Sequence, residues 1–215
     1  MRTDNWLNLL QQQRVIAVIR ASSKSLGEQM AKTVATGGIR LIEITWNSAD
    51  APELISQLHR ELPNCIIGTG TILNQSQLHQ AIDVGAQFIF SPHVDTAVIK
   101  AAVAANVPVV PGALSPTEIV TAWDAGASCV KVFPIQAVGG VSYIKALLGP
   151  LGHIPLIPTG GVTIDNAQEL INIGAIAVGL SGNLFPKSLI DEGNWNAIAK
   201  RAKQLKQRLA PDSLS

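Results

Sequence analysis

A lysine stands in the middle of the short apolar segment Cys129-Val-Lys-Val-Phe133, which otherwise has the composition of a buried β-strand. Side chains of a strand alternate between its two faces, so Lys131 shares a face with Cys129 and Phe133. Burial favours the neutral amine, which is a nucleophile that forms imines with carbonyl compounds. A lysine that reaches solvent from a buried stem, or that forms a structural ion pair, is the alternative.

A second charge occupies the apolar segment Leu41-Ile-Glu-Ile-Thr45. Alternation places Glu43 and Thr45 on one face and the two isoleucines on the other. If both segments face one interior, the amine and the carboxylate converge near the carboxyl ends of the strands. The pair then supplies a Schiff-base nucleophile and a general acid/base, although a structural ion pair would have the same pattern.

Two glycine-rich segments, Pro158-Thr-Gly-Gly-Val162 and Gly179-Leu-Ser-Gly-Asn183, follow later apolar runs. Such loops expose backbone N–H groups, and a helix N-terminus behind them adds positive potential. The sequence therefore predicts a phosphate-binding site at these loops.

Further polar candidates follow other apolar runs. Arg20 is placed to bind a carboxylate or phosphate, or to stay solvated, and Thr71 in Gly68-Thr-Gly-Thr71 is placed to bind substrate or to serve an ordinary turn. His93 follows Pro92 at the carboxyl end of another apolar run. No set of His, Asp and Glu has metal-ligand spacing, so we expect neither a metal nor a cofactor.

Eight runs rich in β-branched residues recur along the chain and would carry these side chains. The predicted strands are Arg14 to Arg20, Leu41 to Thr45, Cys65 to Gly70, Phe88 to Pro92, Val107 to Gly112, Cys129 to Pro134, Pro155 to Gly160 and Ala175 to Leu180. The segments between them have apolar residues at helical spacing, so strand and helix alternate.

Polar residues mark the predicted helix starts, and glycines mark the ends. The predicted capping pairs are Ser25 with Glu28, Asp50 with Glu53, Asn74 with Gln77, and Ser115 with Glu118; the terminating glycines are Gly37, Gly38, Gly85, Gly126 and Gly174. Each unit is a βα step.

Eight such units in 215 residues predict an α/β fold: one (β/α)8 TIM-barrel domain over residues 1–215. An extra N-terminal helix, Asp4 to Gln13, is expected to cover the bottom of the barrel. A C-terminal helix, Trp195 to Leu209, completes the outer ring.

The composition limits the class of partner. The net charge is +1 with no run of like charges, which argues against nucleic acid or a membrane surface. The N-terminal segment Met1 to Trp6 lacks a secretory signal pattern and no apolar run approaches membrane-spanning length, so we expect a soluble intracellular protein with buried, reduced Cys65 and Cys129. Charged residues make up only 14%, which favours a large core or an oligomer interface.

Taken together, these motifs resemble the class I aldolases that cleave 2-keto-3-deoxy-6-phosphogluconate or 4-hydroxy-2-oxoglutarate. The matching motifs are Ala17-Val-Ile-Arg20, Gly38-Ile-Arg-Leu-Ile-Glu-Ile-Thr45, Gly68-Thr-Gly-Thr-Ile-Leu-Asn74, Phe88-Ile-Phe-Ser-Pro-His93, Val110-Pro-Gly112, Lys131-Val-Phe-Pro134 and Pro158-Thr-Gly-Gly-Val162. The resemblance covers nearly the whole chain.

The resemblance implies that Lys131 forms the imine with the substrate ketone and that Glu43 moves the protons. It also implies that the ligands are a phosphorylated keto acid and pyruvate. It further assigns the substrate contacts to Arg20, Thr45, Asn47, Thr71, Pro92, Phe133 and Thr159 and the phosphate contacts to Gly160, Gly161, Ser181 and Gly182. It also implies a cytoplasmic homotrimer of the Entner–Doudoroff pathway.

One position departs from the family pattern. Some members carry an arginine where this chain has Asn47, and Asn47-Ser48 is similar to relatives that act on the galactonate-derived epimer, whereas Thr159 is similar to the gluconate type. Arg20 would supply the missing positive charge. A barrel isomerase or decarboxylase with an electrostatic Lys131, and a non-catalytic sugar-phosphate binding protein, are the competing hypotheses.

Overall fold

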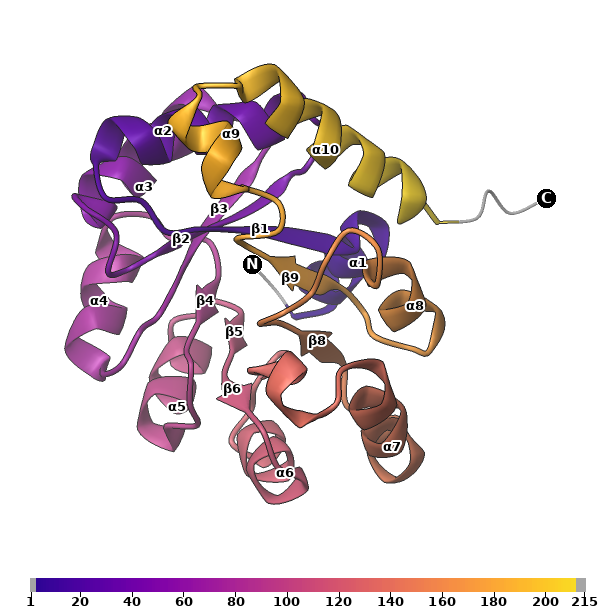
Figure 1. Cartoon of the computed structure of the whole chain (residues 1–215). Helices are drawn as coiled ribbons and strands as arrows, with labels where there is room; N and C mark the ends of the chain where they lie inside the picture. Colours follow the sequence, from indigo (N-terminus) through magenta and orange to yellow (C-terminus); the bar gives the residue numbers. More distant parts are fainter. Residues whose placement is uncertain (1–2, 212–215) are drawn as a thin grey trace.

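The computed structural model describes residues 3–211 and alternates strands with helices (Figure 1). The strands are β1 (Val15–Ile19), β2 (Leu41–Thr45), β3 (Ile66–Gly70), β4 (Ile89–Phe90), β5 (Val109–Val110), β6 (Gly112–Ala113), β7 (Val130–Val132), β8 (Leu156–Pro158) and β9 (Val178–Leu180). The helices are α1 (Thr3–Gln13), α2 (Lys24–Thr36), α3 (Ala51–Glu61), α4 (Gln75–Asp83), α5 (Thr96–Ala104), α6 (Pro116–Asp124), the 3₁₀ helix η1 (Ile135–Val138), α7 (Val141–Leu151), α8 (Ala167–Asn172), α9 (Lys187–Asp191) and α10 (Trp195–Arg208). Met1 and Arg2, at the start of the segment without a signal pattern, lie outside the described residues.

The strands form parallel sheets with helices outside them (Figure 1). One sheet has six strands in the order β5-β4-β3-β2-β1-β9, and the other has three in the order β6-β7-β8. An isolated parallel bridge between Thr159 and Gly179 links the segment after β8 to β9. The fold is therefore α/β with parallel strands, as the alternation of segments predicts.

The ladders are shorter than the apolar runs that predict them. The predicted strand from Val107 to Gly112 divides at Pro111, with β5 pairing with β4 and β6 with β7. Proline has no N–H to donate, which interrupts the ladder at this residue. An apolar run indicates which residues are buried, and the buried segment extends beyond the residues that pair in the sheet.

Two of the four predicted caps are confirmed. The Asn74 side chain accepts a hydrogen bond from the backbone N–H of Gln77, and Ser115 forms a capping box with Glu118. The predicted cap at Ser25 is wrong: the N-cap is Ser23, two residues earlier, where the backbone is extended and the hydroxyl accepts from the N–H of Leu26. Asp50 stands at its predicted position, but its φ of 51° is left-handed and its side chain makes no capping bond.

Buried residues form two clusters on opposite faces of the strands. The outer cluster lies between strands and helices and includes Ile42, Ile44, Val130 and Val132. The inner cluster contains Trp6 and Leu10 of α1 together with strand side chains: Ile16, Val18, Leu41, Phe88, Phe90, Val110, Cys129, Ile157 and Ala177. The predicted alternation of β2 and β7 is thus confirmed.

In residues 3–211 no helix combines the length and the apolar character needed to cross a bilayer.

Candidate active site

A cavity of about 450 Å³ opens at the carboxyl ends of the strands, a volume typical of small-molecule sites. Its lining brings together distant parts of the chain: Val18, Arg20, Glu43, Thr45, Thr71, Pro92, Lys131, Phe133, Thr159, Gly160, Gly161, Val162, Thr163, Gly179, Ser181, Gly182 and Asn183. Twelve of the thirteen residues predicted at the site are among them, and Asn47 is the exception.

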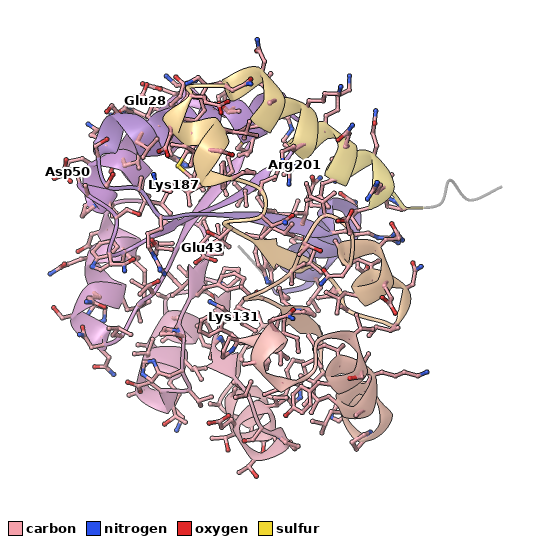
Figure 2. All side chains as sticks on the ribbon, viewed as in Figure 1. Glu28, Glu43, Asp50, Lys131, Lys187 and Arg201 are labelled. Atoms are coloured by element: carbon pink, nitrogen blue, oxygen red, sulfur yellow. The ribbon has the colours of Figure 1, made fainter. Side chains whose placement is uncertain are left out.

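Lys131 lies on β7 and is 7% exposed, and its side chain points into the interior between the strands (Figure 2). Its Nζ stands 4.5 Å from the ring centroid of Phe133 and 6.0 Å from that of Phe90. Burial lowers the pKa of Lys131; the Glu43 carboxylate opposes this effect and the Arg20 charge adds to it. The lower pKa increases the share of the nucleophilic neutral amine near neutral pH.

Glu43 lies on β2 and also points into the interior, where it is 1% exposed (Figure 2). Burial raises the pKa of Glu43, and the charges of Lys131 and Arg20 partly offset the rise. Its Oε2 atom has no hydrogen-bond partner among residues 3–211. A buried carboxyl group with a raised pKa and an unengaged oxygen is suited to accept and return a proton.

The neighbouring thiol does not compete with Lys131. Cys129 is fully buried and unpaired, and burial raises the pKa of its thiol. It therefore stays protonated and inert.

Ser48, which sequence reasoning did not single out for a role, ties the ends of β1 and β2 together. Its Oγ accepts from the N–H of Ala21 at 3.2 Å and lies 3.1 Å from the hydroxyl of Thr45 and 3.5 Å from the carbonyl oxygen of Ile19. Ile19 and Ala21 flank Arg20 in the chain. Ser48 thus holds the backbone on both sides of Arg20 against Thr45.

Thr71 enters the cavity from the loop after β3. Its φ of 62° lies in the left-handed region, which β-branched residues rarely adopt. Such backbone strain is most often found at functional sites. Pro92 follows β4 on the same side of the cavity.

The two glycine loops follow the neighbouring strands β8 and β9, and both line the cavity. Gly160 and Gly161 have φ values of 83° and 94°, which a residue with a side chain would adopt only with strain. The Asn183 Oδ1 atom accepts from the N–H of Ile164 at 2.9 Å and joins the second loop to the first. The backbone N–H groups of these loops are suited to an anion.

Asn47 and His93 lie apart from this cavity. After β2 the chain turns back through a bond from Ser48 N–H to the Thr45 carbonyl oxygen, which leaves Asn47 exposed. His93 is also exposed and lines a separate surface depression. Five further residues line the cavity without having been named as site residues: Val18, Val162, Thr163, Gly179 and Asn183. Val162, Gly179 and Asn183 lie in the two glycine-rich segments predicted to bind phosphate, and strand alternation could have signalled Val18.

Within the described part of the chain, no group of three or more His, Cys, Asp and Glu side chains is placed to hold a metal ion.

A parallel α/β fold with a buried amine and a buried carboxyl group in one cavity has the arrangement of a class I aldolase. The family model described as KDPG and KHG aldolase matches residues 7–201. This chain belongs to that family and is an aldolase, a carbon–carbon lyase.

Relatives and solved structures agree with this assignment. The 2-dehydro-3-deoxy-phosphogluconate aldolase of Haemophilus influenzae is 33% identical over 94% of this chain and 96% of its own, and the KHG/KDPG aldolase of Escherichia coli K12 is 31% identical over 88% and 89%. A structure described as native KDPGal has a TM-score of 0.82 at 30% identity over 90% and 93% of the two chains. KDPG aldolase from Legionella pneumophila, with pyruvate captured at low pH as a covalent carbinolamine intermediate, has a TM-score of 0.85 at 26% identity over 93% and 97%.

Proposed function

We propose that this aldolase reversibly cleaves 2-keto-3-deoxy-6-phosphogluconate to pyruvate and glyceraldehyde 3-phosphate through an imine on Lys131. The observation that carries the proposal is the presence of the Lys131 amine and the Glu43 carboxyl group in one buried cavity. The names of the relatives support the substrate, and the pyruvate carbinolamine in the Legionella pneumophila structure supports covalent chemistry with a ketone.

The first step forms the carbon–nitrogen bond. The neutral Lys131 amine attacks the C2 ketone, and a proton passes from the nitrogen to the oxygen to give a carbinolamine. The carbinolamine then takes up one proton from solvent and loses water, which leaves a protonated imine. The lowered pKa of Lys131 supplies the unprotonated amine for this attack.

The second step breaks the bond between C3 and C4. The Glu43 carboxylate takes the proton of the C4 hydroxyl, directly or through a water, and the bond electrons move into the imine to form an enamine. Glyceraldehyde 3-phosphate leaves, the proton returns from Glu43 to C3 of the enamine, and hydrolysis of the imine releases pyruvate.

The remaining lining residues hold the substrate. Thr71, Thr45 and Arg20 contact the carboxylate end, Phe133 and Pro92 pack against the imine, and Thr159 contacts the hydroxylated chain. Backbone N–H groups and the hydroxyl of the two loops bind the phosphate through Gly160, Gly161, Ser181 and Gly182. The Nζ atom of Lys131 lies 4.5 Å from the centroid of the Phe133 ring, which supports this arrangement.

Cleavage of the galactonate-derived epimer is the second candidate function. It is favoured by the structural similarity to the KDPGal structure and by Asn47-Ser48, which is similar to relatives that act on this epimer. Activity on 4-hydroxy-2-oxoglutarate, which lacks the phosphate, is a third.

The wider setting follows from the same assignment. We propose that residues 1–215 form one closed (β/α)8 barrel with α1 as an extra helix, since the bridge between Thr159 and Gly179 and the chain passing from β5 into β6 join the two sheets. We further propose a cytoplasmic homotrimer acting in the Entner–Doudoroff pathway without a cofactor.

Borohydride trapping tests the mechanism. Incubation with pyruvate and borohydride should add the reduced pyruvyl group to Lys131, as seen by mass spectrometry of the digested protein, while Lys131→Met should take up none. Absence of the adduct would favour an isomerase or decarboxylase with an electrostatic lysine.

Comparison of turnover on the three keto acids tests the substrate. We expect the highest kcat/KM for the gluconate-derived compound. If kcat/KM is highest for the galactonate-derived compound, that compound is the substrate instead. Failure to turn over any of them would leave a sugar-phosphate binding protein.

A further inference from the structure

Two glycines of β3 face the interior at different depths. In the parallel pairing of β2 with β3, Gly68 stands beside Glu43 and Gly70 beside Thr45, so the two glycines share a face and lie two residues apart. Gly68 lies against the aromatic side chain of Phe88, and Gly70 against the carboxyl group of Glu43.

The contact at Gly70 leaves no room for a side chain. A Cβ atom at this position would stand 1.8 Å from Oε1 of Glu43, 2.4 Å from Cδ and 3.0 Å from Cγ. All three are shorter than or at the lower limit of contacts between non-bonded heavy atoms, so the present position of the carboxyl group requires a glycine here.

Within the part of the chain that the structure describes, little else fixes the carboxyl group of Glu43. Its Oε2 atom has no hydrogen-bond partner there, and the charges acting on the carboxyl group come from Lys131 and Arg20. Packing of Oε1 over the bare Cα of Gly70 therefore sets how far the carboxyl group reaches across the cavity.

We infer that Gly70 is a positioning residue that acts through Glu43: it admits the carboxyl group to the place from which protons are exchanged with the substrate. This inference rests on the role of Glu43 in the proposed function. It assigns a function to a strand residue that does not line the cavity.

The neighbouring glycine shows why a change at Gly70 should spare the fold. A Cβ at Gly68 would meet three ring atoms of Phe88 at 2.5–2.6 Å, and this ring is fully buried with Trp6 and Phe90 beside it. At Gly70 the obstacle is the end of a flexible side chain that can swing toward the cavity. The backbone of Gly70 lies outside the left-handed region, so alanine can adopt it.

Gly70→Ala is the first test, with Gly149→Ala as the matched control. Gly149 is exposed on α7, and a Cβ there meets nothing within 4 Å. For Gly70→Ala we expect a melting temperature near that of the wild type, retained borohydride trapping of pyruvate on Lys131, and a kcat for cleavage about 100-fold lower or more, the range of a lost general acid/base. Gly149→Ala should match the wild type in all three.

A double-mutant comparison then tests whether the effect passes through Glu43. In Glu43→Asp the side chain is shorter by about 1.5 Å, one carbon–carbon bond, and leaves space for the added methyl group. Adding Gly70→Ala to Glu43→Asp should lower kcat by less than about threefold, because the two changes act on one group.

Wild-type kcat in Gly70→Ala, loss of its folding, or a full additional 100-fold loss in the Glu43→Asp background would each overturn the inference. These outcomes differ from failure of the proposed function, in which the wild type itself neither traps pyruvate nor cleaves the substrate.

Discussion

The interior has a lower part, on the side of α1, and an upper part, at the carboxyl ends of the strands. The same strands build both parts, but the two have different roles. The lower part packs Trp6, Phe88 and Phe90 against one another, with ring centroids 5.0 and 5.7 Å apart. The upper part places Lys131 and Glu43 in a cavity, with one carboxyl oxygen unpartnered. Aromatic packing stabilises the fold, whereas buried ionisable groups cost stability and are available for reaction. The difference separates the residues that maintain the fold from those that do chemistry.

The largest expected effect separates activity from folding. Lys131→Met removes the imine-forming amine and should lower kcat more than about 10⁴-fold, since covalent catalysis is lost. Methionine fits the apolar surroundings of Phe90 and Phe133, so the melting temperature should stay within a few degrees of the wild type. Turnover and calorimetry on the same sample check both, and retained turnover would reject the covalent mechanism.

The lower part should respond in the opposite way. Phe88→Ala removes a fully buried ring and should reduce the free energy of unfolding by about 3–5 kcal/mol. Denaturant titration measures the loss. At a temperature where the variant remains folded, its kcat should stay within a few-fold of the wild type; a loss as large as that of Lys131→Met would remove the distinction between the two parts.

Ser48 lies at the edge of the upper part and should have an intermediate effect. Ser48→Ala leaves the N–H of Ala21 without its partner and loosens the backbone around Arg20. We expect the free energy of substrate binding to weaken by about 1 kcal/mol, which corresponds to roughly a fivefold rise in KM, with a smaller change in kcat. Steady-state kinetics of Ser48→Ala, alone and combined with Arg20→Ala, checks this. If Ser48 acts through Arg20, the KM of the double variant should not exceed that of Arg20→Ala alone.

The smallest effect concerns the pH at which trapping begins. Trapping requires neutral Lys131, whose pKa lies below its ordinary value of 10.5, so the trapping rate should rise with pH through a midpoint below 10.5. The Glu43 carboxylate raises the pKa of Lys131, so Glu43→Gln should move this midpoint to lower pH. The measurement is the trapping rate with pyruvate against pH. A shift toward higher pH would show that the two groups are not coupled in this way.

Patterns along single strands were predictable, and contacts between elements were not. Alternation placed Glu43 and Lys131 on the interior face because strand geometry alone decides it. Asn47 was expected at the substrate but is exposed, because the turn after Thr45 depends on hydrogen bonds that the residue types do not reveal. The fit between Gly70 and Glu43 likewise depends on side-chain positions across two strands.

The filled lower part leaves the reaction cavity as a dead end. Trp6 and Leu10 are fully buried among the lower side chains, while Gly161, Ser181 and Gly182 lie exposed at the mouth. In the proposed reaction the phosphorylated fragment sits outermost and the pyruvyl group is attached deepest. Products would therefore depart in a fixed sequence, with the aldehyde first and pyruvate last, and an incoming aldehyde would block the exit of pyruvate.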